Sequence, residues 1–295
     1  LIRHADQAMY MAKKAGKNGY QLFDSAYDDA SNIKQENISN ISTGFNKSEF
    51  VLHYQPKVNI STGEVVGVEA LIRWQHPTRG LVPPLDFLPM VESQPISLEI
   101  GEWVIDTALS QISEWQSSGV NLIISVNISA YQLQQANFVE RLAALLTVHP
   151  DVSPHTLELE ILETSAFSDI NHIIKTMQAC IELGVQFALD DFGTGYSSLI
   201  YLKRLPVNLI KIDQSFIRDM LTDTDDLAIV RGVVSLAKAF HLPVIAEGVE
   251  TVEHGTALLQ LGCELAQGYG IARPMPASNV PTWVECWKPD KAWLS

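Results

Sequence analysis

The feature that most constrains the fold is a regular alternation of short β-rich runs and longer helical patterns after residue 50. The β-rich runs stand at 51–58, 65–72, 121–128, 156–162, 185–192, 209–212, 243–249 and 264–270. Helical patterns lie between them, at 100–115, 138–146, 170–183, 228–240 and 257–261. About eight strands alternating with helices over about 240 residues are typical of a (β/α)8 barrel. We therefore predict an α/β protein built on a TIM-like barrel.

The connection between the first two runs departs from this scheme. Only the turn Asn59–Gly63 separates them. A parallel pair needs a crossover of about a dozen residues or more, whereas a short turn joins antiparallel strands. We therefore expect the first strand to run antiparallel to the rest of the barrel.

Polar side chains recur at or near the ends of these runs, within otherwise apolar sequence. They are Glu69, Asn127, Glu158, Glu160, Glu163, Asp190, Asp191, Lys211, Asp213, Glu247 and Gln267. The carboxyl ends of barrel strands meet on one face, where active sites lie. Burying this many carboxylates is costly unless cations neutralise them.

Two interpretations of these residues remain open at this point. Each acid taken singly is more often a helix cap or an ion-pair partner. Taken together, carboxylate and amide oxygens without Cys or His suit Mg²⁺ or Mn²⁺, and the adjacent Asp190 and Asp191 could bridge two such ions. Lys211 is either a plain ion-pair partner or a group that orients or deprotonates a nucleophilic water.

The segment that follows these two aspartates, Phe192–Leu199, contains glycines on both sides of Thr194. It is either an ordinary strand-to-helix turn or a flexible gate over the metals that transmits the state of a dimer or partner.

The net charge narrows the class of partner. Lys and Arg number 20 and Asp and Glu 34, giving a net charge of −14. Such a balance argues against binding a nucleic-acid polymer, which needs a cationic surface.

The three cysteines have no CxxC spacing, and we expect them to be reduced thiols of a cytoplasmic protein. No run reaches the ~18 apolar residues of a membrane span, so we expect no membrane contact by this piece. Because the chain begins at Leu1, we read it as a fragment of a longer protein whose missing part could carry a membrane anchor.

Several motifs in order resemble the EAL-domain family of cyclic di-GMP phosphodiesterases. The matching segments are YQPKV at 54–58, EALIRW at 69–74, VNIS at 126–129, LELEILET at 157–164, DDFGTGYSSL at 190–199, LKRLPVNLIKID at 202–213, AEGVET at 246–251 and QGYGIARPMP at 267–276. The resemblance implies a barrel with an antiparallel first strand and hydrolysis of cyclic di-GMP to linear 5′-pGpG with two Mg²⁺ or Mn²⁺ ions. It also implies a homodimer.

The resemblance assigns roles position by position. Glu69, Asn127, Glu160 and Asp190 match the ligands of one metal, and Asp190 and Asp191, with Glu247 close by, match those of the second. Glu247 matches the general base, Lys211 the lysine on the nucleophilic water, and Glu163 the glutamate that steadies the DFGTGYSSL loop. The positions that line the dinucleotide site are Gln55, Leu71, Arg73, Asp213, Glu250, Gln267 and Pro274. Arg73 suits a phosphate because guanidinium presents a fork of donors; alternatively, it pairs with a surface acid.

Two rival functions stay open. A catalytically silent receptor would bind cyclic di-GMP and signal by protein contact, but such members usually lack several ligands or have a degraded loop. An unrelated barrel acting on sugars is the second rival.

The N-terminal segment Ala5–Asn18, ADQAMYMAKKAGKN, resembles the C-terminal end of a GGDEF, or diguanylate cyclase, domain. The cyclase loop itself is absent from this chain. We therefore expect a GGDEF remnant over 1–24, a linker over 25–44 and the phosphodiesterase domain over 45–290.

Overall fold

The computed structural model describes residues 25–163, 170–195 and 202–294. The chain forms two compact units, Leu1–Ser48 and Glu49–Ser295. Within the first unit the described part is one helix, α2 (Ser25–Asn46), which contains the predicted linker segment. The predicted GGDEF remnant over 1–24 lies outside the described residues. Among the helices that are described, none has the length and apolar character needed to cross a bilayer.

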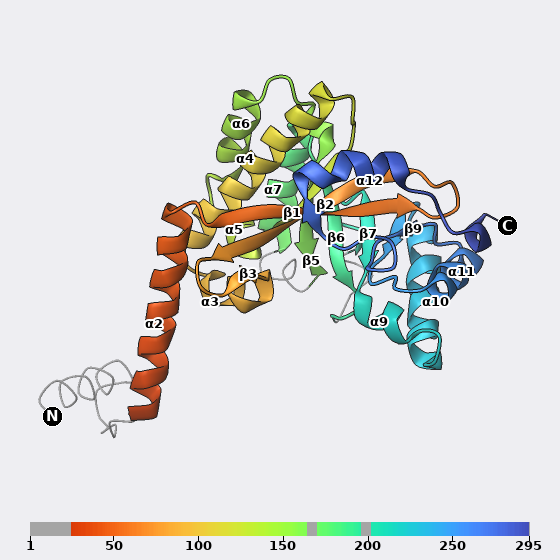
Figure 1. Cartoon of the computed structure of the whole chain (residues 1–295), viewed down its shortest axis with the longest axis horizontal. Helices are drawn as coiled ribbons and strands as arrows, with labels where there is room; N and C mark the ends of the chain where they lie inside the picture. Colours follow the sequence, from red (N-terminus) through yellow and green to blue (C-terminus); the bar gives the residue numbers. More distant parts are fainter. Residues whose placement is uncertain (1–24, 164–169, 196–201, 295) are drawn as a thin grey trace, which may run out of the picture. The chain divides into compact units, whose positions relative to one another are not determined.

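Eight strands of the second unit form a closed barrel (Figure 1). They are β1 (Phe50–Asn59), β2 (Val65–His76), β4 (Ile123–Ile128), β5 (Leu157–Leu162), β6 (Gln186–Phe192), β7 (Leu209–Ile212), β8 (Val244–Ala246) and β9 (Leu265–Ala266). Neighbours from β2 to β9 pair in parallel. β1 pairs antiparallel with both β2 and β9 and so closes the barrel. The predicted TIM-like barrel with an antiparallel first strand is confirmed.

The turn between β1 and β2 is shaped by one asparagine side chain. Asn59 Oδ1 accepts hydrogen bonds from the backbone N–H groups of Ser61 (2.9 Å) and Thr62 (3.0 Å). An asparagine in this role stabilises a tight turn locally. The turn sets a register in which Gln55 of β1 stands opposite Glu69 of β2.

Helices cover the outside of the barrel (Figure 1). The long ones are α4 (Pro95–Ser117), α6 (Phe138–Val148), α7 (Ile170–Glu182), α10 (Thr224–Ala239) and α11 (Val252–Leu261). Their C-terminal ends match those of the five predicted helical patterns to within two residues. α4 shows the cause, since Ile105, Leu109 and Ile112 recur at helical spacing and are all buried.

Some elements differ from the sequence expectation. The short elements β3 (Gly80–Val82), β10 (Met275–Pro276), α3 (Leu88–Val91), α5 (Ala130–Leu133), α9 (Gln214–Asp219) and α12 (Val280–Cys286) were not predicted. β2 continues to His76 because its end pairs with β3, so Glu69 lies mid-strand rather than at a strand end. β8 ends early because Gly248, with φ +72°, turns the chain out of the extended conformation.

Strand β5 places polar side chains inside the barrel. Along β5, Leu157, Leu159 and Ile161 alternate with Glu158 and Glu160, and all five are buried. The apolar set faces the surrounding helices, whereas both glutamates contact lysines from other barrel strands. The period of two therefore places carboxylates inside the barrel.

Candidate active site

A buried lysine ammonium lies at the centre of the carboxylates. Lys211 Nζ is 2.5 Å from Glu160 Oε2, 2.7 Å from Glu247 Oε1, 3.1 Å from Asp190 Oδ1 and 3.6 Å from Glu69 Oε2. These side chains come from five different strands or strand ends. Burial by itself lowers the pKa of Lys211, but the surrounding carboxylates, led by Asp190, raise it well above its ordinary value. The side chain is therefore a cation at neutral pH.

Glu69 is held by amide donors on both oxygens. Asn127 Nδ2 donates to Oε1 (2.8 Å) and Gln267 Nε2 donates to Oε2 (2.7 Å). Gln267 Nε2 also reaches Gln55 Oε1 at 3.1 Å. Burial raises the pKa of Glu69, but Lys211 and the two amides outweigh it and leave the pKa below its usual value. Glu69 is thus an ionised carboxylate in a fixed orientation.

Three carboxylates lie close together at the carboxyl ends of β6 and β8, and two of them also face Lys211. Asp190, Asp191 and Glu247 each offer one oxygen, and these oxygens lie within 4.8 Å of one another. Asp191 has φ +54°, a strained backbone for a residue other than glycine. Burial and then the neighbouring Asp190 raise the pKa of Asp191 to about 7. Burial likewise raises the pKa of Glu247, well above its ordinary value.

The donor set fits hard divalent cations. It consists of carboxylate and amide oxygens, the ligands that Mg²⁺ and Mn²⁺ prefer. Glu160 is 1% exposed, and its Oε1 has no hydrogen-bond partner among the described residues. Burial raises the pKa of Glu160 to about 8. A cation would neutralise the charge and satisfy this oxygen.

The residues predicted to line a substrate site follow Glu69 along β2. Leu71 and Arg73 lie on the same face of the strand, two and four residues further on. Arg73 is half-buried, and its Nη1 donates to the carbonyl of Ile72 at 2.9 Å. Burial is the main cause that lowers the pKa of Arg73.

The remaining predicted substrate residues lie at other places around the site, and Asp213 forms a side-chain hydrogen bond with Asp191. Asp213 caps helix α9 through the backbone N–H of Ser215 (3.0 Å). Glu250 is exposed, and Pro274 directly precedes β10. Among the described residues, neither Glu250 nor Pro274 forms a side-chain hydrogen bond or ion pair with the carboxylates.

Glu163 contacts the loop after β6. Its Oε2 accepts hydrogen bonds from the backbone N–H groups of Gly193 (2.8 Å) and Gly195 (3.4 Å). The rest of the predicted gate, from residue 196, lies outside the described residues. The loop-steadying role of Glu163 remains a prediction that this contact supports.

Sequence reasoning listed Glu158 but missed its partners Lys57 and Ser125, with which it forms a second polar layer inside the barrel. Lys57 Nζ contacts Glu158 Oε1 at 2.7 Å and also contacts the hydroxyl of Ser125. Ser125 Oγ donates to the same Glu158 oxygen at 2.6 Å. The available signal was the spacing of two between Gln55 and Lys57 in an apolar strand, which places both on the inner face.

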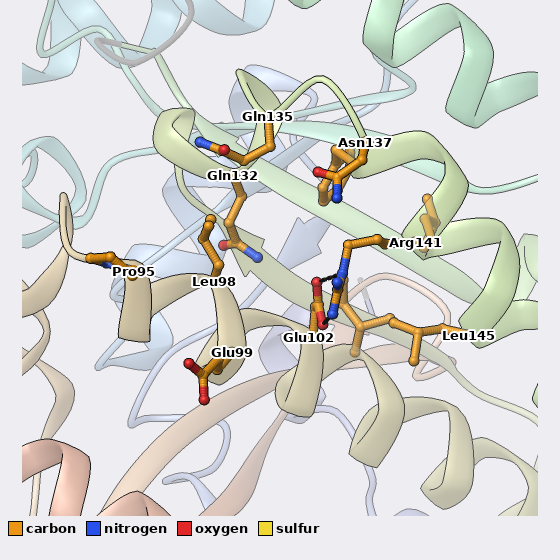
Figure 2. Close-up of a pocket in the computed structure, with 12 residues that line it drawn as sticks. Pro95, Leu98, Glu99, Glu102, Gln132, Gln135, Asn137, Arg141 and Leu145 are labelled. Carbon is orange, nitrogen blue, oxygen red and sulfur yellow. Dashed lines mark hydrogen bonds and ion pairs between the residues drawn. The ribbon is translucent and has the colours of Figure 1, made fainter.

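A separate hollow lies on the outside of the barrel between α4 and α6 (Figure 2). Its lining includes Pro95 at the start of α4, Gln132, and an ion pair between Glu102 and Arg141. It shares no residue with the carboxylate site.

The fold and this site define a class of protein, a TIM-like barrel with a carboxylate-lined mouth, and the family comparison agrees. The EAL domain family model matches residues 38–274. The chain therefore belongs to the EAL domain family.

Alignments with individual relatives cover most of this chain. The bifunctional diguanylate cyclase/cyclic di-GMP phosphodiesterase MucR of Pseudomonas aeruginosa is 41% identical over 281 residues, which is 95% of this chain. The cyclic di-GMP phosphodiesterase PdeR of Escherichia coli is 38% identical over 284 residues, 96% of this chain. The chain spans 41% and 42% of the lengths of these two relatives. A solved structure of the PaMucR phosphodiesterase in its c-di-GMP complex matches with a TM-score of 0.80 and 41% identity, covering 83% of this chain and 99% of that one.

Proposed function

We propose that this chain is a cyclic di-GMP phosphodiesterase that hydrolyses its substrate to linear 5′-pGpG with two Mg²⁺ or Mn²⁺ ions. The observation that carries the proposal is the convergence of Glu69, Glu160, Asp190 and Glu247 on Lys211 inside an EAL-family barrel. The names of the relatives MucR and PdeR support the same substrate.

Two sets of oxygen donors would hold the cations. Glu69, Asn127, Glu160 and Asp190 would hold one, and Asp190, Asp191 and Glu247 the other, with Asp190 shared. When bound, the two ions would polarise the phosphodiester and lower the pKa of the attacking water. The ions also explain how an acidic chain can take an anionic dinucleotide.

Lys211 and Glu247 complete the chemistry. The Lys211 ammonium has no lone pair to accept a proton, so its role is to donate a hydrogen bond that orients the water. Glu247, whose pKa is raised, accepts the proton as the water oxygen attacks phosphorus. The bond from phosphorus to the 3′ oxygen then breaks, and this oxygen takes a proton from solvent while Glu247 releases its own, so the product carries a 5′-phosphate and a free 3′-hydroxyl.

The residues along and beside β2 would bind the dinucleotide. Arg73 would pair with a phosphate through its guanidinium fork. The other proposed contacts, which define the walls of the site, are Gln55, Leu71, Asp213, Glu250, Gln267 and Pro274. Glu163 would hold the adjoining loop in place through its contacts to Gly193 and Gly195.

The test is turnover of cyclic di-GMP with added Mg²⁺ or Mn²⁺, followed by chromatography for pGpG. We expect metal-dependent turnover that chelation abolishes and fresh metal restores. Binding of cyclic di-GMP without turnover by the fragment and by the full-length protein would refute the enzyme and leave a silent receptor. A sugar-processing barrel predicts no nucleotide binding at all.

Three further proposals concern the protein around the site. We propose that residues 45–290 form the phosphodiesterase domain and that 1–24 are the end of a GGDEF domain, joined through 25–44. We also propose a homodimer that contacts near the loop after β6. Analytical ultracentrifugation tests the dimer, and limited proteolysis tests the domain limits.

A further inference from the structure

The mechanism above does not use the buried charged layer formed by Lys57 on β1, Ser125 on β4 and Glu158 on β5. These three side chains are 3%, 0% and 4% exposed, so solvent contributes almost nothing to their solvation. Lys57 and Glu158 form a 2.7 Å ion pair, and Ser125 bonds to both. The layer is therefore internally satisfied.

One contact joins this layer to the candidate active site. Lys57 Nζ lies 3.6 Å from Glu160 Oε1, too far for a hydrogen bond but within ion-pair distance. Glu160 Oε1 is the oxygen that has no hydrogen-bond partner among the described residues. The other oxygen of the same carboxylate faces Lys211 at 2.5 Å. Glu160 is thus held between two lysines, one from each layer.

A structural role alone is a weak explanation of this layer. Replacing a buried ion pair with well-packed apolar side chains is often neutral or stabilising, so such a pair adds little to stability. By contrast, removing a residue that contacts and orients a metal ligand commonly lowers metal affinity or activity about 10- to 100-fold.

We propose that Lys57, Ser125 and Glu158 are positioning residues, which fix the Glu160 carboxylate in the orientation that binds a divalent cation. This inference rests on the proposed function, because it needs Glu160 to be a metal ligand. Lys57 supplies the charge that faces Glu160 Oε1, and Glu158 with Ser125 fixes the Lys57 ammonium at that place.

The test uses the double variant Lys57→Met/Glu158→Gln. It removes one charge of each sign, so the net charge is unchanged. Neither member of the Lys57–Glu158 pair is left buried alone, and Glu160 loses Lys57 but keeps Lys211. The variant Glu102→Gln/Arg141→Met makes the same chemical changes at the outer ion pair between α4 and α6 (Figure 2) and serves as the matched control. Mn²⁺ binding is measured by electron paramagnetic resonance, beside kcat and KM for cyclic di-GMP.

We expect the double variant to bind Mn²⁺ about 10- to 100-fold more weakly and to lose kcat, with KM for the dinucleotide unchanged. The control variant should have the same Mn²⁺ affinity, kcat and KM as the wild type. Unchanged Mn²⁺ affinity and kcat in a folded double variant would overturn the inference. A wild-type chain that binds no Mn²⁺ and shows no turnover would instead overturn the proposed function, and this inference with it.

Ser125→Ala keeps the test decisive if the double variant does not fold. It removes one hydroxyl and leaves the ion pair, so we expect a smaller loss of Mn²⁺ affinity, about two- to tenfold. A Ser125→Ala protein that binds Mn²⁺ as tightly as the wild type would contradict the positioning role.

Discussion

Replacing Glu69 with alanine separates chemistry from folding. The carboxylate accepts bonds from Asn127 (2.8 Å) and Gln267 (2.7 Å) and faces Lys211 at 3.6 Å. Hydrogen bonds to charged groups contribute about 1.5–3 kcal/mol each. Asn127 is exposed and can turn to water, and Gln267 keeps its bond to Gln55.

The change also relieves repulsion, because the charge of Glu69 contributes to the raised pKa of Glu160, after burial. We therefore expect Glu69→Ala to lower the free energy of unfolding by only about 1–3 kcal/mol, less than a domain's usual stability. Loss of a metal ligand is more serious for the reaction. If it removes about 4 kcal/mol of transition-state stabilisation, kcat falls by about 10³-fold.

The assay pairs cyclic di-GMP turnover with urea unfolding. Glu64→Gln is the matched control, since it changes an exposed carboxylate just before the same strand. Glu64→Gln should keep wild-type turnover and stability. A folded Glu69→Ala protein with a normal rate would show that Glu69 is not a ligand, and an unfolded one would refute the stability reasoning.

Three further predictions address pH, the loop and the core. Metal ions compete with protons for Asp191 and Glu160, whose pKa values are raised to about 7 and about 8, so Mn²⁺ affinity should weaken as the pH falls from about 9 to about 6; calorimetry that finds no pH dependence would contradict this. Gly195→Ala would place a methyl group 2.8 Å from Glu163 Oε1 and should lower kcat while leaving Mn²⁺ affinity intact, as turnover and binding assays would show. Phe87→Ala, at a side chain only 1% exposed, should cost about 3–5 kcal/mol in denaturant unfolding, and a loss below 1 kcal/mol would refute its place in the core.

The sequence predicted the barrel well because its signals are local and repeated. Strand and helix periods, and a turn too short for a parallel crossover, follow from neighbouring residues alone. β3 and β10 were missed because each has only two or three residues and, unlike β8 and β9, neither lies in one of the longer β-rich runs. The position of Glu69 within β2 was missed because pairing with β3, a distant segment, extends the strand.

The site was predictable as a set of residue types but not as an arrangement. Polar residues in apolar strands identified Glu69, Glu160 and Lys211 as candidates. The barrel register decides which side-chain atoms come into contact. The four carboxylates around Lys211 therefore could not be predicted from the spacing of residues along the sequence. The spacing of Lys57 from Gln55 indicates only that its side chain faces the barrel interior. Its partner Glu158 is set by the barrel register, so the ion pair could not be predicted.

The measurement that tests the central claim most directly is cyclic di-GMP turnover by this chain with and without divalent metal. Our account predicts that pGpG forms with Mg²⁺ or Mn²⁺, that chelation stops its formation, and that added metal restores it. Failure of the folded protein to form pGpG with either metal, both as this chain and at full length, would contradict the account.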